Sequence, residues 1–257
     1  MIEKSHAKVN IFLKMLGTRD AYHALTSRFM RVETLFDTLS FERKPDNSKE
    51  FVLEGDFGCQ LHQNTIYKAF TALLKENPNR KISNFFDEYK VVVEKKIPEF
   101  AGLGGGSSNA AAFLRLTNRT LNLGHSSDKL ANIGANIGAD VPFFVYDYPS
   151  ANVSGIGEVV RPFDEETLDI ETFTPDVLCH TGKVYQRFRE GYLKDIDIKS
   201  ALALENLSSK ELMEKYDALF LNDLFAPALD IYPTLETYHD NNFFSGSGST
   251  FFKVNHG

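Results

Sequence analysis

At residues 98–112 the chain reads Pro98-Glu99-Phe100-Ala101-Gly102-Leu103-Gly104-Gly105-Gly106-Ser107-Ser108-Asn109-Ala110-Ala111-Ala112. Four glycines let the backbone come close to a ligand, and the alanines that follow favour a helix. The first N–H groups of such a helix and the positive end of its dipole together bind anions. The stretch therefore predicts a loop that holds a phosphate group in front of a helix.

The glycine pattern by itself leaves other interpretations open. The loop lacks the Gly-Lys-Ser or Gly-Lys-Thr ending of a Walker A motif, and it fits the dinucleotide-binding pattern G-x-G-x-x-G only loosely. Glycines at this place also allow a helix to pack closely on a strand without any ligand. The serines at 107 and 108 favour the phosphate interpretation, because their hydroxyls can reach a phosphate or a magnesium ion.

The composition of the chain is that of a globular protein. Its 257 residues are 42% hydrophobic, which is enough for one large domain or two small ones. The formal net charge of −7 disfavours a nucleic acid or an anionic membrane as the main partner. No apolar run approaches the ~20 residues of a membrane span, and the first residues do not resemble a signal peptide. We therefore expect a cytoplasmic protein.

Cysteine and histidine usage disfavours a structural disulfide and a zinc site. Cys59 and Cys179 are far apart and form no Cys-x-x-Cys pair, which is typical of a reducing compartment. The seven histidines show neither His-x-His nor His-Glu-x-x-His spacing. A metal ion is therefore expected only together with a nucleotide.

Apolar spacing outlines the elements around the loop. Residues 8–16 alternate apolar and polar side chains, which predicts a half-buried strand that begins at Lys8. Further strand patterns occur at residues 29–41, 51–53, 89–93, 243–244 and 251–252. Helical patterns occur at residues 64–75, 107–121, 184–193 and 210–218. The order around the glycines is therefore strand, loop, helix.

Two predictions concern the ends of helices after the loop. Gly124 follows the helix at 107–121 and is expected to be the residue that ends it. The next helix is expected to end near Gly138 and to leave Asp140 in the turn before a proline. Asp140 is thus predicted to be positioned by the end of a helix.

Three motifs together resemble the galactokinase, homoserine kinase, mevalonate kinase and phosphomevalonate kinase (GHMP) superfamily. The glycine loop is similar to the superfamily's phosphate loop, and Ala7-Lys8-Val9-Asn10 is similar to its first motif. Ser245-Gly246-Ser247-Gly248-Ser249 is similar to its third motif, a glycine turn that closes over the active site. These motifs extend over nearly the whole chain.

Further details resemble one family of this superfamily, the 4-diphosphocytidyl-2-C-methyl-D-erythritol kinases of the non-mevalonate isoprenoid pathway. The segments that carry this resemblance are residues 17–23, 104–111, 138–144 and 155–158. The resemblance implies transfer of the ATP γ-phosphoryl group to the 2-hydroxyl of a cytidine diphosphate methylerythritol substrate, with Mg²⁺ bound to the nucleotide. It implies a mixed α/β and α+β GHMP-kinase fold with an N-terminal ATP-loop domain over 1–157 and a ferredoxin-like C-terminal domain over 158–257.

The resemblance assigns Asp140 as the catalytic carboxylate and Lys8 as its partner. A carboxylate can take the proton of an attacking hydroxyl, and an ammonium keeps it ionised and stabilises the transferring charge. Without the resemblance, Asp140 would be interpreted as a helix C-terminal turn residue whose carboxylate accepts from backbone N–H groups. Lys8 would be interpreted as a solvated strand end.

The resemblance also assigns two sets of binding residues. The expected ATP site consists of Asn64, Lys95, Gly102, Leu103, Gly104, Gly105, Gly106, Ser107, Ser108 and Asn109. The expected substrate site consists of Asn10, Tyr22, His23, Thr181, Tyr185, Gly246, Ser247 and Gly248. In this family the aromatic pair at 22 and 23 recognises the cytidine part of the substrate by stacking and hydrogen bonds.

Simpler interpretations of some of these residues stay open. Tyr22 and Tyr185 can also be explained as half-buried aromatic residues, although for Tyr185 the binding interpretation is favoured. Lys95 and Lys96 are equally explained as the solvated charged end of the preceding strand.

The sequence departs from the family pattern at three places. Ser5-His6 stands where small residues or proline are usual before Ala-Lys. The segment from Gly17 to His23 is one residue shorter and has Ala21 where glycine is usual, so its turn is expected to differ. The chain also ends soon after the third motif, which suggests a reduced C-terminal cap.

Other functions remain as alternatives at this point. One is another small-molecule kinase of the superfamily, of the homoserine or mevalonate type, and one is a non-catalytic ligand-binding relative. The pair at 22 and 23 favours the cytidine substrate over the other kinases, since an acceptor without a base does not need it. The expected partners are small molecules only, with the protein a monomer or a weak homodimer.

Overall fold

The computed structural model describes residues 1–19, 22–45 and 48–255. These residues form two compact units. Unit 1 contains Met1–Ala7, Leu35–Glu99 and Gly105–Asp147, and unit 2 contains Lys8–Thr34, Phe100–Gly104 and Tyr148–Gly257. The predicted division into domains at residue 157 stays a prediction.

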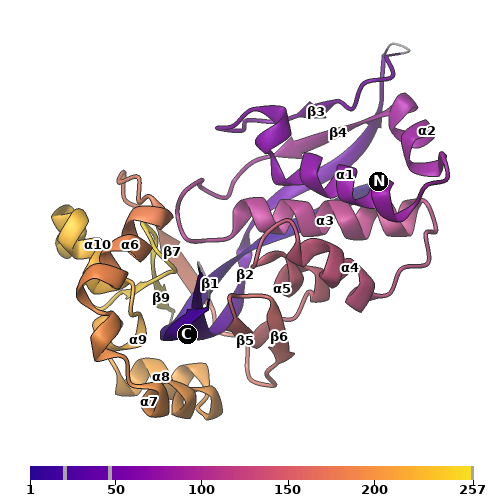
Figure 1. Ribbon diagram of the computed structural model, residues 1–257. Helices are drawn as coiled ribbons and strands as arrows, with labels where there is room; N and C mark the ends of the chain where they lie inside the picture. Colours follow the sequence, from indigo (N-terminus) through magenta and orange to yellow (C-terminus); the bar gives the residue numbers. More distant parts are fainter. Residues whose placement is uncertain (20–21, 46–47, 256–257) are drawn as a thin grey trace. The chain divides into compact units, whose positions relative to one another are not determined.

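Strands and helices are labelled in chain order (Figure 1). The strands are β1 Ile2–Arg19, β2 Tyr22–Arg43, β3 Leu53–Glu54, β4 Tyr89–Glu94, β5 Ser150–Gly155, β6 Val159–Pro162, β7 Ile170–Phe173, β8 Phe243–Phe244 and β9 Phe251–Val254. The α-helices are α1 Thr65–Glu76, α2 Lys81–Glu88, α3 Gly105–Thr120, α4 Ser127–Ala135, α5 Val141–Tyr146, α6 Thr181–Gly191, α7 Ile198–Ala203, α8 Ser209–Lys215, α9 Ala218–Leu221 and α10 Phe225–Ile231. Short 3₁₀ helices are η1 Leu61–Gln63, η2 Leu193–Asp195, η3 Leu204–Asn206 and η4 Pro233–Tyr238.

The long strands β1 and β2 pair with each other, and each continues from one unit into the other. In unit 1 the second half of β2 pairs antiparallel with β4, and β4 pairs parallel with β3. In unit 2 the first half of β2 pairs antiparallel with β5, which pairs antiparallel with β6. The predicted strands at 8–16, 29–41 and 89–93 are therefore confirmed, with wider bounds.

The first strand differs from its prediction in burial. Every residue from Ala7 to Leu13 is buried, so β1 is covered on both faces and is not half-buried. An alternation of apolar and polar residues predicts that the polar face of a strand meets water. Here the polar residues Lys8 and Asn10 form hydrogen bonds inside the protein instead, so that face is buried as well. The interpretation of Lys8 as a solvated strand end is therefore wrong.

The core of unit 1 is built from phenylalanine rings of a strand, three helices and the segment before β3. Phe86 of α2 lies 5.2 Å from the ring of Phe41 and 5.4 Å from that of Phe113. Phe51 stacks on Phe70 of α1 at 4.2 Å. Contacts of this kind add to the burial of aromatic area and fix α1, α2 and α3 on the strands. Figure 1 shows α1, α3, α4 and α5 grouped in this unit, where α3 packs against the other three.

The helix that follows the glycine loop ends differently from the prediction. Asn122 has a positive φ of 47°, its N–H donates to the carbonyl of Arg119, and the N–H of Leu123 donates to that of Asn118. This is a Schellman ending with asparagine in the left-handed position. The prediction that Gly124 ends the helix is therefore wrong, because asparagine also tolerates this conformation and comes first.

Unit 2 contains a second, three-stranded antiparallel sheet in the order β7-β9-β8. Its buried face packs into a cluster in which Phe225 of α10 stacks on Phe244 at 4.6 Å and Phe244 lies 5.2 Å from Phe251. Phe244 and Phe251 are paired across the hairpin of β8 and β9. The predicted turn between two apolar Phe-Phe pairs is thus confirmed.

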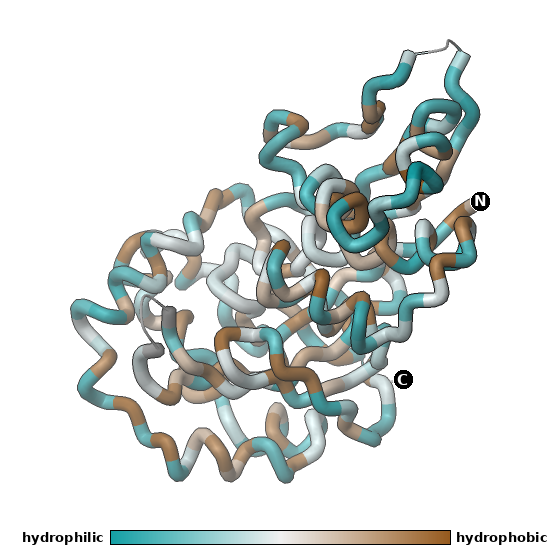
Figure 2. Tube along the Cα trace, turned by 45° about the vertical axis from the view of Figure 1, so that its right-hand side comes forward, coloured by the Kyte–Doolittle hydropathy of each residue, from teal (hydrophilic) through white to brown (hydrophobic). Residues whose placement is uncertain are grey.

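Hydrophobic residues are distributed in short segments along the trace (Figure 2). Within the described part of the chain, none of the helices combines the length and the hydropathy that a membrane crossing requires.

We predict that the phenylalanine cluster of unit 1 carries much of its stability. Phe86→Ala removes a ring that is 2% exposed and should lower the free energy of unfolding by about 3–5 kcal/mol. Phe173→Ala, at a ring that is 53% exposed, should cost less than about 1 kcal/mol. Urea unfolding followed by circular dichroism measures both values, and equal losses would contradict the assignment of this core.

Candidate functional site

Three motifs that are distant in the sequence meet in unit 2. The ammonium of Lys8 donates to Asn10 Oδ1 at 2.6 Å and to the carbonyl of Gly102 at 3.0 Å. Ser245 Oγ donates to the same carbonyl at 3.1 Å and accepts from the N–H of Asn10 at 3.4 Å. The first motif, the glycine loop and the third motif are therefore joined by hydrogen bonds among buried and partly buried groups.

The Lys8 ammonium has an aromatic neighbour as well. It lies 4.6 Å from the ring centroid of Phe29, a distance typical of a cation–π contact. The backbone N–H of Lys8 donates to the carbonyl of Leu103, and Asn10 Nδ2 donates to Ser27 Oγ at 2.9 Å. These contacts hold both side chains of the first motif in one orientation.

The loop and the third motif approach so closely that both need glycine. Gly102 has a φ of +74°, and a Cβ atom there would lie 2.2 Å from the carbonyl oxygen of Ser245. Gly246 has a φ of +59°, and its Cβ atom would lie 3.3 Å from the Cα of Gly102. Any side chain at Gly102 would push the two segments apart.

The glycine turn of the third motif is held from two sides. Asn222 Nδ2 donates to the carbonyls of Phe244 and Gly246, at 2.8 and 2.9 Å. On the other side Ser247 Oγ lies 2.8 Å from Thr181 Oγ1, at the first residue of α6. Gly248 follows with a φ of +90°. The structure thus brings the predicted residues Gly246, Ser247 and Thr181 together.

His23 and Tyr185, which are both expected in the substrate site, also lie side by side. Their rings lie 5.4 Å apart, and the His23 ring lies 5.7 Å from that of Phe188, one turn of α6 further on. His23 is 5% exposed, yet its Nε2 has no hydrogen-bond partner in the described part of the chain. Buried polar nitrogens are nearly always bonded, so this atom is suited to meet a ligand.

The electrostatics of this site favour the neutral form of the His23 imidazole. Burial lowers the pKa of the His23 imidazole below 6.5, and the positive charge of Arg189 on α6 lowers it further. A neutral ring has one nitrogen that donates and one that accepts, which suits hydrogen bonding to a heterocyclic base. The side chain of Tyr22 lies outside what the structure describes, as do Asp20 and Ala21, where the shorter turn was predicted.

The second part of the glycine loop belongs to unit 1 and begins α3. Gly104 has a φ of +70°, and Gly105, Gly106 and Ser107 are the first three residues of the helix. No acidic residue lies in the first turn of α3. The predicted order of strand, loop and helix is confirmed, and the first N–H groups of this helix are of the kind that binds phosphate.

Asp140 is positioned by a helix end, although not by the predicted one. It is the N-cap residue of α5, whereas α4 ends five residues earlier, at Ala135. Its carboxylate makes no capping hydrogen bond to α5, so it is not used to satisfy the helix end. The turn before it approaches α3, since a Cβ atom at Gly138 would lie 3.5 Å from Ser107 Oγ.

The expected ATP residues Asn64, Lys95, Ser108 and Asn109 all lie in unit 1. Asn64 caps α1, because its side chain accepts from the N–H of Ile66. Lys95 is only 10% exposed and forms an ion pair with Asp37 at 2.5 Å, whereas Lys96 is 52% exposed. The solvated interpretation is therefore wrong for Lys95 and holds for Lys96.

Ser108 and Asn109 are buried and bonded to neighbours within unit 1. Ser5 Oγ donates to Ser108 Oγ at 2.8 Å, and Asn109 Nδ2 donates to Ser5 Oγ and to Asp37 Oδ2, also at 2.8 Å. Ser107 is the half-buried serine of the pair. Of the two hydroxyls expected near phosphate or magnesium, that of Ser107 is the better placed.

Sequence reasoning missed two buried residues that organise these sites, Asp37 in unit 1 and Asn222 in unit 2. Both residues have large apolar neighbours on either side in the sequence, Asp37 in Leu35-Phe36-Asp37-Thr38-Leu39 and Asn222 in Phe220-Leu221-Asn222-Asp223-Leu224-Phe225. A polar residue in an apolar run indicates a buried group that needs partners. That signal is present in the sequence, but it does not say which partners are used.

Residues 1–19, 22–45 and 48–255 hold no group of three or more histidine, cysteine, aspartate or glutamate side chains that could bind a metal ion.

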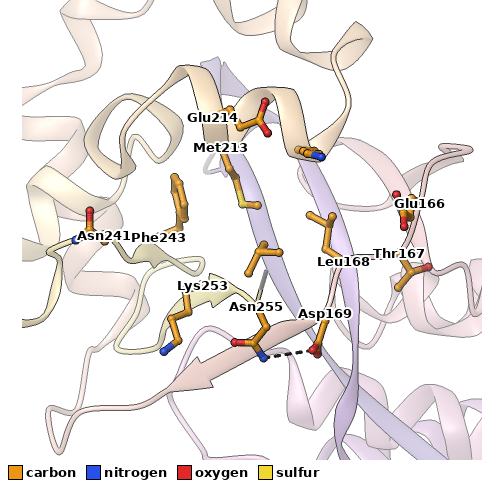
Figure 3. Close-up of a pocket in the computed structure, with 12 residues that line it drawn as sticks. Glu166, Thr167, Leu168, Asp169, Met213, Glu214, Asn241, Phe243, Lys253 and Asn255 are labelled. Atoms are coloured by element: carbon orange, nitrogen blue, oxygen red, sulfur yellow. Dashed lines mark hydrogen bonds between the residues drawn. The ribbon is translucent and has the colours of Figure 1, made fainter. Parts of the chain in front are cut away.

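A separate pocket of about 510 Å³ lies within unit 2 (Figure 3). Leu168, Met213 and Phe243 point into it, and Asn255 bonds to Asp169 at its edge. None of the predicted site residues lines this pocket. Its position therefore adds nothing to the sites described above.

Comparison with known proteins gives consistent matches. The family model described as the GHMP kinases N terminal domain matches residues 64–148. A 4-diphosphocytidyl-2-C-methyl-D-erythritol kinase of Sulfurimonas denitrificans is 51% identical over 255 residues, which cover 98% of this chain and 96% of that protein. The protein of the same name from Sulfurovum sp. is 53% identical and covers 97% of each.

Solved structures agree with these matches. A crystal structure of 4-(cytidine 5'-diphospho)-2C-methyl-D-erythritol kinase superposes with a TM-score of 0.76 at 28% identity, over 100% of this chain and 91% of that one. A mevalonate kinase, at 14% identity and a TM-score of 0.67, shares the fold. The expected two-domain GHMP-kinase fold is thus confirmed. The chain belongs to the 4-diphosphocytidyl-2-C-methyl-D-erythritol kinase family of the GHMP kinases.

Proposed function

We propose that the protein transfers the γ-phosphoryl group of ATP to the 2-hydroxyl of 4-diphosphocytidyl-2-C-methyl-D-erythritol. The observation that carries the proposal is the buried Nε2 of His23, which lies beside the ring of Tyr185 and has no hydrogen-bond partner among the described residues. A pyrimidine base needs a stacking surface and a directional hydrogen-bonding group, and this pair offers both. A homoserine or mevalonate acceptor has no base and would leave that nitrogen unsatisfied.

The glycine loop supports ATP as the other substrate. Its glycines and the first N–H groups of α3 offer donors to phosphate oxygens, and the dipole of this 16-residue helix favours negative charge at the same end. In unit 2, Gly246, Ser247 and Gly248 form a glycine turn, and the hydroxyl of Thr181, at the start of the aromatic helix α6, lies 2.8 Å from that of Ser247. This turn suits contacts with the acceptor.

The chemical step assigns a role to each reacting group. The acceptor oxygen forms a bond to the γ-phosphorus, the bond from that phosphorus to the β-γ bridging oxygen breaks, and ADP leaves. The hydroxyl proton passes to the Asp140 carboxylate, late in the step because aspartate is a weak base for an alcohol. The Lys8 ammonium stabilises the negative charge on the group being transferred. Asn10 Oδ1 and the Gly102 carbonyl hold this ammonium in position by accepting its hydrogen bonds.

Magnesium fits this proposal as a companion of the nucleotide. Mg²⁺ usually keeps several waters and binds the phosphates, with one or two protein oxygens added. Ser107 offers a hydroxyl at the first turn of α3. When bound, the ion would neutralise charge on the phosphates. We further propose that the protein acts in the cytoplasm as a monomer or weak homodimer.

The reaction is tested by a substrate panel with ADP release as the readout. The cytidine substrate should support turnover, and homoserine and mevalonate should not. Turnover with either of them at a higher kcat/KM would refute the assigned acceptor. ATP binding with no turnover for any acceptor would support a non-catalytic relative.

We predict that Asp140→Asn keeps ATP-analogue binding within about twofold and lowers kcat by about 10²–10⁴-fold, because positioning survives while the proton acceptor is lost. Asp128→Asn, at an exposed residue of α4, serves as the control and should keep full turnover. Near-normal kcat in Asp140→Asn would remove this carboxylate from the mechanism.

We predict that His23→Ala raises KM for the cytidine substrate at least about tenfold, since one buried hydrogen bond and a ring contact are lost, and leaves KM for ATP unchanged. His125→Ala, in unit 1, is the matched control. An unchanged KM for the cytidine substrate in His23→Ala would exclude this residue from base recognition.

The lowered pKa of His23 gives a pH dependence of substrate binding. Because that pKa lies below 6.5, the ring is mostly neutral near pH 7 and becomes protonated as the pH falls, so KM for the cytidine substrate should rise toward lower pH. His23→Gln, which does not titrate, should lack this rise. Initial-rate measurements across pH test both statements, and a rise that persists in His23→Gln would point to another group.

A further inference from the structure

The carboxylate of Asp37 accepts four hydrogen bonds inside unit 1. It is 0% exposed. Oδ1 accepts from the backbone N–H groups of Lys96 and Ile97, at 2.6 and 2.8 Å. Oδ2 accepts from Lys95 Nζ at 2.5 Å and from Asn109 Nδ2 at 2.8 Å. A buried charge is stable only with such partners, so the geometry of all four is coupled to this carboxylate.

These partners lie at both ends of the phosphate loop. Lys96 and Ile97 come directly before Pro98, where the loop begins, and Asn109 lies in the helix that ends it. One carboxylate thus fixes the two points between which the loop must close. Without it the loop would gain conformational freedom that nucleotide binding would have to remove.

Asp37 also determines the position of a positive charge. Lys95 Nζ bonds to Asp37 and, at 3.0 Å, to Asn109 Oδ1. A Cβ atom at Gly105, the first residue of α3, would lie 3.7 Å from this ammonium. The ammonium is therefore held at the end of the helix where the first N–H groups are offered to an anion.

We propose that Asp37 is the positioning residue of the phosphate loop. It acts through Lys95, Asn109 and the two backbone N–H groups and does not itself touch substrate. This inference rests on the proposed function, because it takes the loop to be the site that binds ATP.

The test replaces the carboxylate by an amide of the same shape. Asp37→Asn keeps the oxygen that accepts from the two backbone N–H groups but turns a donor toward Lys95 and Asn109. Affinity for a non-hydrolysable ATP analogue with Mg²⁺, measured by calorimetry without acceptor, should fall at least about tenfold. KM for the cytidine substrate should stay within about twofold. Asp87→Asn on α2 is the control and should leave affinity unchanged.

A swap variant separates positioning from general stability. The double variant Asp37→Asn with Asn109→Asp exchanges the two side chains. It places a carboxylate at position 109, within reach of Lys95, and an amide at position 37. Because Asn109 is itself an expected ATP residue, the swap should restore analogue affinity only in part, to within about tenfold of the parent protein. If Asp37→Asn lowers the melting temperature but leaves the affinity of the folded protein unchanged, the proposal is wrong. It is equally wrong if the swap restores folding and not affinity.

The swap also keeps the test decisive if Asp37→Asn alone does not fold. Because calorimetry needs no acceptor, a parent protein that binds the analogue without phosphorylating the cytidine substrate would contradict only the proposed function.

Discussion

The buried ammonium of Lys8 is the constraint on which the organisation of unit 2 depends. A buried charge without partners costs several kcal/mol, so Lys8 must find acceptors wherever the chain can supply them. It finds them on its own strand, at Asn10 Oδ1, and in the glycine loop, at the carbonyl of Gly102. Ser245 binds the same carbonyl, which brings in the third motif. Segments more than 90 residues apart are thereby fixed to one cation.

The glycines follow from this arrangement. The backbones of Gly102 and Gly246 approach so closely that a side chain at Gly102 would collide with the carbonyl of Ser245. Both glycines also have positive φ, which β-branched or bulky residues rarely adopt. The small residues of the loop and of the third motif are therefore needed for packing as well as for access to a ligand. In unit 1 the buried carboxylate of Asp37 organises the same loop, because it accepts hydrogen bonds from residues before and after it.

Much of this could be predicted from the sequence, because the signals are local. The alternation of apolar and polar residues predicts the strand that carries Lys8, and the run from Gly102 to Ala112 predicts the loop and the helix that follows. The resemblance of three motifs indicates the family. The polar face of β1 was predicted as solvated because its partners, at Gly102, Ser245 and Ser27, are distant in the sequence. The end of α3 was misplaced because Asn122 and Gly124 both tolerate left-handed backbone and only the hydrogen bonds distinguish them. Asp37 and Asn222 were missed for the same reason as the burial of the polar face of β1. A buried polar residue needs hydrogen-bond partners, but the local sequence does not show which residues they are.

The central claim is that the loop serves a kinase whose acceptor carries a cytidine diphosphate, and phosphorus NMR of the reaction products tests it most directly. With ATP and 4-diphosphocytidyl-2-C-methyl-D-erythritol, we predict equal amounts of ADP and of one new phosphomonoester on the acceptor, with the diphosphate of the cytidine part intact. Formation of inorganic phosphate without a new ester, or cleavage of that diphosphate, would contradict the account.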